Sequence, residues 1–241
     1  MIGSTADRPT DRAARASAAL AEALEAAQEV DLSWLGRKLT DDGWEIAADT
    51  LRLLSALVER LRPRHVVEFG SGVSTVVLAR AAVRAGGCRV SSIDHDPRFV
   101  SASRQALEHG EGCELVELQL APLVARSRAG ILGPEYLIDP LLLASKHPAD
   151  LVLIDGPPDV LGGRSGMLYQ ALDHAQCGSI VLLDDAARSA ELAALKSWDQ
   201  RLGDAIHIQH LDGFAKGLAT VIVAAPAKAQ IRIAGVPKDR A

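Results

Sequence analysis

A glycine-rich turn with an acid in front of it is the first sign of chemistry in this sequence. In EFGSGVST, Gly70 and Gly72 flank Ser71, and Glu68 stands two positions before the first glycine. Glycine adopts the backbone angles of a tight turn freely and lets a ligand approach the backbone, because it has no Cβ. Ser74 lies where a helix is expected to begin, so free N–H groups would face the same space. The pattern predicts a nucleotide-binding turn.

Two residues of this turn narrow the choice of ligand. A dinucleotide-binding fingerprint would place Gly or Ala at the position of Thr75, where the helix packs closely around a pyrophosphate. A carboxylate at Glu68 would repel a pyrophosphate but attract a ligand that carries an ammonium or sulfonium group. The turn therefore favours a cationic nucleoside, and an NAD-type dinucleotide is the alternative.

The second apolar run ends in two acids with different expected roles. Asp94 ends the run, at the place where an acid reaches the hydroxyl pair of a ribose. Asp96 precedes Pro97, which is typical of an N-cap followed by proline at the first helical position. We expect Asp94 to bind the ligand and Asp96 to cap a helix.

A second group of acids follows two later apolar runs. Asp155 ends DLVLID, and Asp184 and Asp185 end SIVLLDD. If these runs are neighbouring strands, their ends lie about 5 Å apart. Carboxylates this close repel one another unless a proton or a cation lies between them, and Mg²⁺ prefers such oxygen ligands. The three acids therefore predict a divalent metal site. The alternative is that Asp185 caps the next helix and that Asp155 with Gly156 only forms a turn.

The loop DGPPDVLGGRSGMLY after Asp155 is expected to cover the same crevice. Its Arg164 and Tyr169 could meet the substrate, and Arg188 could pair with the acids. Tyr136, Trp34, Trp44 and Phe214 are expected in the core.

The elements that position these residues alternate along the chain. Short apolar runs separated by helical segments predict parallel strands with crossover helices on both faces; the runs are 65–69, 89–93, 114–120, 150–155 and 179–184. Too few residues join 205–211 to 218–224 for a helix, so this pair must be antiparallel. The fold class is a doubly wound α/β fold with a mostly parallel seven-stranded sheet and an antiparallel last strand pair, preceded by N-terminal helices.

The N-terminal part is expected to be helical at 11–29 and 44–61. We expect a helical extension over 1–40 and the α/β domain over 41–241. The helices before Pro63 would cover the substrate side and could form a homodimer. The link 121–149 is long and is expected to carry part of a substrate pocket.

Composition excludes several classes of protein. The chain has 241 residues and a net charge of −5 with mixed signs, which argues against nucleic-acid binding. Its three scattered cysteines predict neither disulfides nor zinc. No apolar run is long enough to span a membrane, and the N-terminus lacks a secretory apolar segment. We expect a cytoplasmic protein.

The combination of Glu68-x-Gly-x-Gly, Asp94 and Asp155 with an antiparallel terminal pair resembles the class I S-adenosylmethionine-dependent methyltransferases over roughly residues 40–225. The resemblance implies that the turn holds the methionine part, Glu68 faces the amino group, and Asp94 holds the ribose. The implied cofactor-binding residues are Glu68, Gly70, Ser71, Gly72, Ser74, Asp94, His95, Ala121 and Asp155. His95 and Ala121 would line the adenine, although LAPL at 120–123 lacks the acid often found after the third strand.

The second acid group is similar to that of the metal-dependent, catechol-type O-methyltransferases. That resemblance implies Asp155 and Asp184 as catalytic residues, and Asp155, Asp184 and Asp185 as ligands of Mg²⁺ beside an acceptor hydroxyl. Pro158 stands where that group has a lysine. The expected activity is methylation of a small molecule at oxygen. The alternatives are a non-catalytic cofactor-binding scaffold or sensor, and an NAD-type oxidoreductase.

Overall fold

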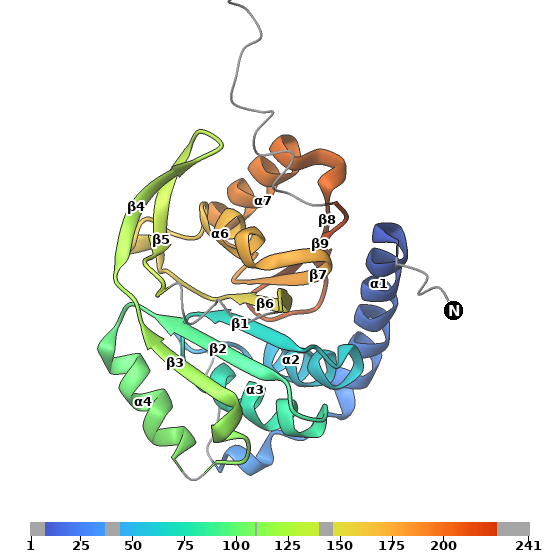
Figure 1. The fold of residues 1–241 in the computed structure, drawn as a ribbon, viewed down its shortest axis with the longest axis vertical. Helices are drawn as coiled ribbons and strands as arrows, with labels where there is room; N and C mark the ends of the chain where they lie inside the picture. The colour runs from blue at the N-terminus through green and yellow to red at the C-terminus, as the bar shows by residue number, and fades with distance from the viewer. Residues whose placement is uncertain (1–7, 37–43, 109, 140–146, 226–241) are drawn as a thin grey trace, which may run out of the picture.

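A computed structural model describes residues 8–36, 44–108, 110–139 and 147–225, which form a seven-stranded sheet with helices on both faces and a separate two-stranded sheet (Figure 1). The seven strands have the order β3-β2-β1-β6-β7-β9-β8. They are β1 (His65–Phe69), β2 (Arg89–Asp94), β3 (Val116–Leu120), β6 (Ala149–Ile154), β7 (Ala175–Asp184), β8 (Ile206–Leu211) and β9 (Leu218–Val223). Strand β9 runs antiparallel to both β7 and β8, and the other pairs are parallel. The predicted fold class is confirmed.

The helices lie where the sequence pattern placed them, with shifted ends. They are α1 (Pro9–Ala26), α2 (Ala48–Leu61), α3 (Val73–Arg84), α4 (Pro97–Leu107), α6 (Met167–His174) and α7 (Ser189–Leu202). Single 3₁₀ turns lie at η1 (Ala27–Glu29), η2 (Ser33–Leu35), η3 (Cys113–Leu115), η4 (Asp159–Leu161) and η5 (Gly203–Ala205). Helix α2 begins four residues later than predicted, because Ala47 before it is extended.

Each face of the sheet has its own apolar core. Side chains alternate along a strand, so Val66 packs with helices α1, α2 and α3, whereas Val67 packs on the opposite face with α6 and α7. The same alternation places Leu151 and Val152 of β6 on opposite faces. Because both faces are covered, the central strands β6 and β7 are largely apolar, and the carboxyl ends of the strands remain as the place where polar side chains gather.

The predicted link 121–149 contains a hairpin that the sequence analysis missed. Strands β4 (Leu123–Arg128) and β5 (Ile131–Tyr136) pair antiparallel. Ala129 and Gly130 form the two-residue turn with φ values of 51° and 77°, the geometry of a hairpin turn that matches strand twist. Pro134 is tolerated in β5 because this strand belongs to a two-stranded sheet and therefore has a free edge. Residues 140–146 of the link lie outside the described residues.

Helix α1 packs on α2 and on the neighbouring strand β7. Arg12 Nη1 donates to Gln176 Oε1 at 3.0 Å, and a Cβ at Gly178 would lie 2.7 Å from the Cβ of Arg12. Ala16 and Leu20 are buried in the same core as α2. The division at residue 40 and the homodimer stay predictions.

In the described parts of the chain, no helix combines the length and the apolar character needed to cross a lipid bilayer. The cytoplasmic location stays a prediction.

Candidate active site

The glycine turn lies directly against the end of β6. Gly70 has a φ of 105°, and a Cβ there would lie 3.0 Å from the carbonyl carbon of Asp155. Gly70 also donates its N–H to the carbonyl oxygen of Ile93 in β2 at 2.8 Å. Only glycine fits this position, and the close contact brings the turn and Asp155 together at the carboxyl ends of β1 and β6.

Glu68 lies beneath the turn rather than at the surface of the crevice. Its side chain is fully buried, and its Oε2 accepts hydrogen bonds from Thr75 Oγ1 at 2.6 Å and Ser92 Oγ at 2.5 Å. Its Oε1 has no hydrogen-bond partner among the described residues. Burial raises the pKa of Glu68 to about 7, although the surrounding hydroxyls favour the charged form. The described residues therefore leave Oε1 without a hydrogen bond of good geometry under the turn, with the Ser74 hydroxyl nearby.

Thr75 has a polar role that the sequence analysis did not foresee. Besides donating to Glu68, its hydroxyl accepts the N–H of Gly72 at 3.0 Å. Its position at the third residue of α3 lets the hydroxyl tie the turn to β1.

Asp94 is held at the end of β2 by backbone N–H groups. Its Oδ2 accepts from Ser71 at 2.8 Å, its Oδ1 accepts from Asp96 at 2.8 Å, and His95 Nδ1 lies 3.2 Å from Oδ1. Burial raises its pKa. Ala121 is buried and donates its N–H to the carbonyl oxygen of Asp94 at 2.8 Å. The predicted N-cap at Asp96 is confirmed, and the residues predicted for ribose and adenine lie together.

A cavity of about 700 Å³ opens beside the turn. Its lining includes Ser71, Gly72, Ser74 and Asp155 on the turn side, and Trp34, Trp44, Ile46 and Phe99 on the outer side. Trp44 was predicted to be a core residue, but 70% of it is exposed. Residues before α2 therefore cover this side of the crevice, and the prediction that the helices before Pro63 cover the substrate stays a prediction.

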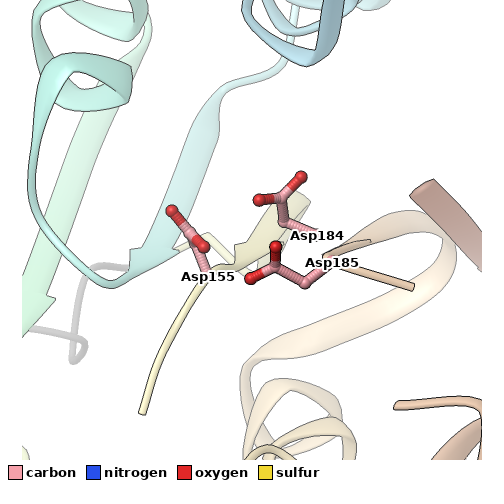
Figure 2. A group of neighbouring side chains, drawn as sticks. All are labelled: Asp155, Asp184 and Asp185. Atoms are coloured by element: carbon pink, nitrogen blue, oxygen red, sulfur yellow. The ribbon is translucent and has the colours of Figure 1, made fainter. Parts of the chain in front are cut away.

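The three aspartates converge across the ends of β6 and β7. Ile154 pairs with Leu183, so Asp155 and Asp184 follow at matched positions. Asp185 has a φ of 58°, in the left-handed region. Figure 2 shows Asp184 and Asp185 on one side and Asp155 on the other, with oxygens turned toward the space between them. One oxygen from each lies within 4.8 Å of the others, so the predicted cluster is confirmed as a geometric group.

Burial and mutual repulsion favour protonation of this cluster. Burial and the neighbouring Asp184 raise the pKa of Asp155 well above its ordinary value. Burial and the neighbouring Asp185 raise the pKa of Asp184 to about 6. The carboxylates form an oxygen-only donor set of the kind that a hard divalent cation prefers, but the guanidinium of Arg164 already lies among them.

Arg164 lies in the cluster, not in the substrate space where we expected it. Its Nη2 donates to Asp155 Oδ1 at 3.1 Å and to Asp185 Oδ2 at 2.9 Å. Arg188 Nη1 lies 2.9 Å from the same oxygen of Asp185, so its predicted pairing is confirmed. Tyr169 was also expected at the substrate. This prediction is wrong, because Tyr169 lies in α6 and its side chain is fully buried in the apolar core.

Tyr136 is a residue at the site that the sequence analysis assigned only to the core. Its ring stacks on Phe69 with centroids 5.6 Å apart, and lies 6.2 Å from the ring of His95. Its buried hydroxyl has no hydrogen-bond partner among the described residues. A Cβ at Gly156 would collide with this hydroxyl. Tyr136 ends β5, and because that hairpin had no clear sequence signal, its place beside Gly156 could not be predicted.

Comparisons with known proteins agree with this geometry. The family model described as "Methyltransferase domain" matches residues 67–186, about half of the chain, from β1 through the acids after β7. No curated protein sequence matches the chain.

Several solved structures share the fold. The O-methyltransferase TomG from Streptomyces achromogenes, in complex with SAM, is 19% identical with a TM-score of 0.56, covering 85% of this chain and 89% of TomG. SAH-bound PaMTH1 from Podospora anserina is 18% identical with a TM-score of 0.58, and the match covers 92% of this chain and 99% of PaMTH1. An O-methyltransferase from Bacillus cereus in complex with SAH is 16% identical with a TM-score of 0.57, and the match covers 86% of this chain and 90% of the Bacillus cereus protein. These structures show the same fold, and the family match with its glycine turn identifies the chain as a member of the class I S-adenosylmethionine-dependent methyltransferases.

Proposed function

We propose that the chain transfers the methyl group of S-adenosylmethionine to an oxygen atom of a small molecule. The observation that carries this proposal is the position of the aspartate cluster, which meets the glycine turn where Gly70 touches Asp155. Carboxylates at that point can orient a hydroxyl group and accept its proton. TomG and the Bacillus cereus protein, which share the fold, are O-methyltransferases.

The cavity supports a small acceptor. At about 700 Å³ it has the size of a pocket for a cofactor or a small molecule. Its walls combine aromatic side chains, Trp44 and Phe99, with polar groups at Ser71 and Asp155. We infer an acceptor with an apolar or aromatic body and at least one hydroxyl group.

The cofactor would lie across the ends of β1 and β2. We propose that it is bound by Glu68, Gly70, Ser71, Gly72, Ser74, Asp94, His95, Ala121 and Asp155. The unpaired Oε1 of Glu68 supports an ammonium group above it, since a buried carboxylate gains most from a charged donor. Asp94 already accepts two backbone N–H groups, which fix its carboxylate for the ribose.

The reaction is a direct displacement. An acceptor oxygen attacks the methyl carbon, the carbon–sulfur bond breaks with its electron pair going to sulfur, and the acceptor proton passes to a carboxylate. Asp184 is the best base, because Asp155 and Asp185 accept from the Arg164 guanidinium whereas Asp184 Oδ1 accepts from the neutral hydroxyl of Thr50 at 3.3 Å. Most of the rate would come from holding donor and acceptor at attack distance.

A divalent ion is a second candidate for this site, favoured by the convergence of three oxygens within 4.8 Å. Asp155, Asp184 and Asp185 would hold it, and it would lower the pKa of an acceptor hydroxyl.

The proposal is tested by incubating the protein with isotope-labelled S-adenosylmethionine and a panel of small aromatic acceptors that carry hydroxyl, amino or thiol groups. We expect methyl ethers, detected by mass spectrometry together with S-adenosylhomocysteine. Methylation confined to nitrogen or sulfur would contradict the choice of oxygen.

Asp184→Asn is the informative variant. We expect it to lower kcat about 10²- to 10⁴-fold, the usual contribution of a general base, and to leave calorimetric binding of the cofactor unchanged. Asp204→Asn is the matched control, because this exposed acid lies in η5, before the start of β8 and away from the cluster. Binding of NAD in place of S-adenosylmethionine would instead support the oxidoreductase alternative.

A further inference from the structure

We propose that Arg164 is the built-in cation of the aspartate cluster and holds Asp155 and Asp185 in place for methyl transfer without a divalent ion. This inference rests on the proposed function for its catalytic consequence. Its structural part concerns only which cation the cluster carries.

The guanidinium of Arg164 is tied to both strand ends at once. Nη1 donates to the carbonyl oxygen of Asp184 at 2.6 Å, and Nη2 donates to the carbonyl oxygen of Asp155 at 2.9 Å. The same Nη2 reaches the carboxylates of Asp155 and Asp185. Four contacts from one planar group fix both the backbone at the ends of β6 and β7 and the two carboxylates between them.

Burial makes this arginine a permanent part of the cluster. Only 4% of its side chain is exposed, and its Nε lies 3.9 Å from Oε1 of the buried Glu191 in α7. The neighbouring acids raise the pKa of Arg164 even though burial opposes its charge. A guanidinium keeps its charge at every pH at which a protein is folded, so the cluster always contains one positive charge.

The loop that carries Arg164 is braced independently of the acids. Ser165 accepts at its carbonyl oxygen a 2.8 Å hydrogen bond from Trp198 Nε1, and Trp198 is fully buried. Met167 donates its N–H to the carbonyl oxygen of Arg164 at 3.0 Å as α6 begins. The guanidinium is therefore placed by the fold before any ligand binds, which is the requirement for a preorganised site.

Arg164 supplies what the acids require from a cation. Three adjacent carboxylates need a proton or a positive charge among them. Arg164 and Arg188 each contribute one positive charge. Arg188 is 42% exposed on its side chain and contacts only Asp185 of the three, so its charge is better screened. Arg164 is thus a positioning residue that leaves Asp184 free to take the proton of the acceptor.

The first test measures the cation of the cluster and needs no acceptor. Mg²⁺ is titrated calorimetrically, and the unfolding temperature is followed with and without Mg²⁺, for the chelator-treated native protein and for Arg164→Met. We expect no Mg²⁺ binding and no shift in unfolding temperature for the native protein. For Arg164→Met we expect Mg²⁺ binding and a higher unfolding temperature, because three carboxylates then lack their central charge. Stoichiometric Mg²⁺ binding by the native protein would overturn the inference.

Arg164→Lys and Arg188→Met complete the design. Arg164→Lys keeps the charge but loses the planar fork, so it decides the question even if Arg164→Met does not fold. We expect Arg164→Lys to bind no Mg²⁺ and to lower kcat by up to about 100-fold, the cost of misplacing reacting groups by about 1 Å, with an unchanged cofactor Kd. Arg188→Met removes the better-screened charge beside Asp185, so its effect in both assays should be smaller than that of Arg164→Met.

The two proposals fail in different ways. Turnover by the native protein that persists in chelator supports the inference, and turnover that disappears in chelator and returns with Mg²⁺ overturns it. If no tested acceptor is methylated, the proposed function fails, but the Mg²⁺ titration still shows whether Arg164 is the cation of the cluster.

Discussion

The hydroxyl of Thr75 donates a 2.6 Å hydrogen bond to Oε2 of Glu68 and accepts a 3.0 Å hydrogen bond from the N–H of Gly72. One side chain in the first turn of α3 thus connects the glycine turn to the acid buried beneath it. The shape of the turn and the charge state of Glu68 are therefore physically linked.

Thr75→Val should destabilise the fold. Valine has nearly the same shape but leaves Gly72 and Glu68 without this partner inside the protein, and buried polar groups that lose a hydrogen bond cost about 1–3 kcal/mol each. Urea unfolding would measure the loss, with Thr75→Ser as the matched control that keeps the hydroxyl. If Thr75→Val and Thr75→Ser unfold at the same urea concentration, the hydrogen bonds contribute nothing.

The stability of the protein without cofactor should fall between pH 4.5 and 7 because of Glu68. Its pKa is raised from 4.5 to about 7, so the folded state binds more protons than the unfolded state in this window. The stabilisation is fully present below pH 4.5 and lost as pH rises through 7. A shift of this size corresponds to roughly 3 kcal/mol. Glu68→Gln carries no titrating group, and the difference between its unfolding free energy and that of the native protein should follow this pH dependence. A constant difference would contradict it.

Affinity for S-adenosylmethionine should increase with pH up to about 7. The ammonium group of the cofactor favours the charged form of Glu68, which must lose its proton when the cofactor binds. Below the pKa of about 7, affinity should rise as much as about tenfold per pH unit. Calorimetry in buffers of different ionisation enthalpy would count the released proton. Glu68→Gln should bind more weakly without this proton release. Equal release by both proteins would assign the proton to another group.

Gly156→Ala should be strongly destabilising, and Tyr136→Phe should relieve part of the effect. A Cβ at Gly156 collides with the hydroxyl of Tyr136 but lies 3.4 Å from Gly70 Cα, an ordinary contact. Overpacking of this kind costs about 1–3 kcal/mol. A double-mutant cycle by thermal unfolding should therefore give a coupling between the two positions. Additive effects would mean that Gly156 is required for another reason.

Local patterns were sufficient to predict most of the scaffold. Alternating apolar runs and helical segments gave the parallel strands, and the short connection between β8 and β9 gave the antiparallel pair. The hairpin β4–β5 was missed because Pro134 and Gly133 weaken its strand pattern. Its tertiary position against the start of α6 is what places Tyr136 beside Gly156.

The sequence by itself determined the fold class, the glycine turn and the meeting of Asp155 with Asp184, because strand order and register bring the carboxyl ends of β6 and β7 together. Only the tertiary structure decided what lies among those acids. The direction of Arg164 depends on how its loop folds back and on Trp198, which lies in α7. The depth of Glu68 depends on how α3 packs over β1. Such contacts depend on packing between distant elements, and local periodicity does not encode them.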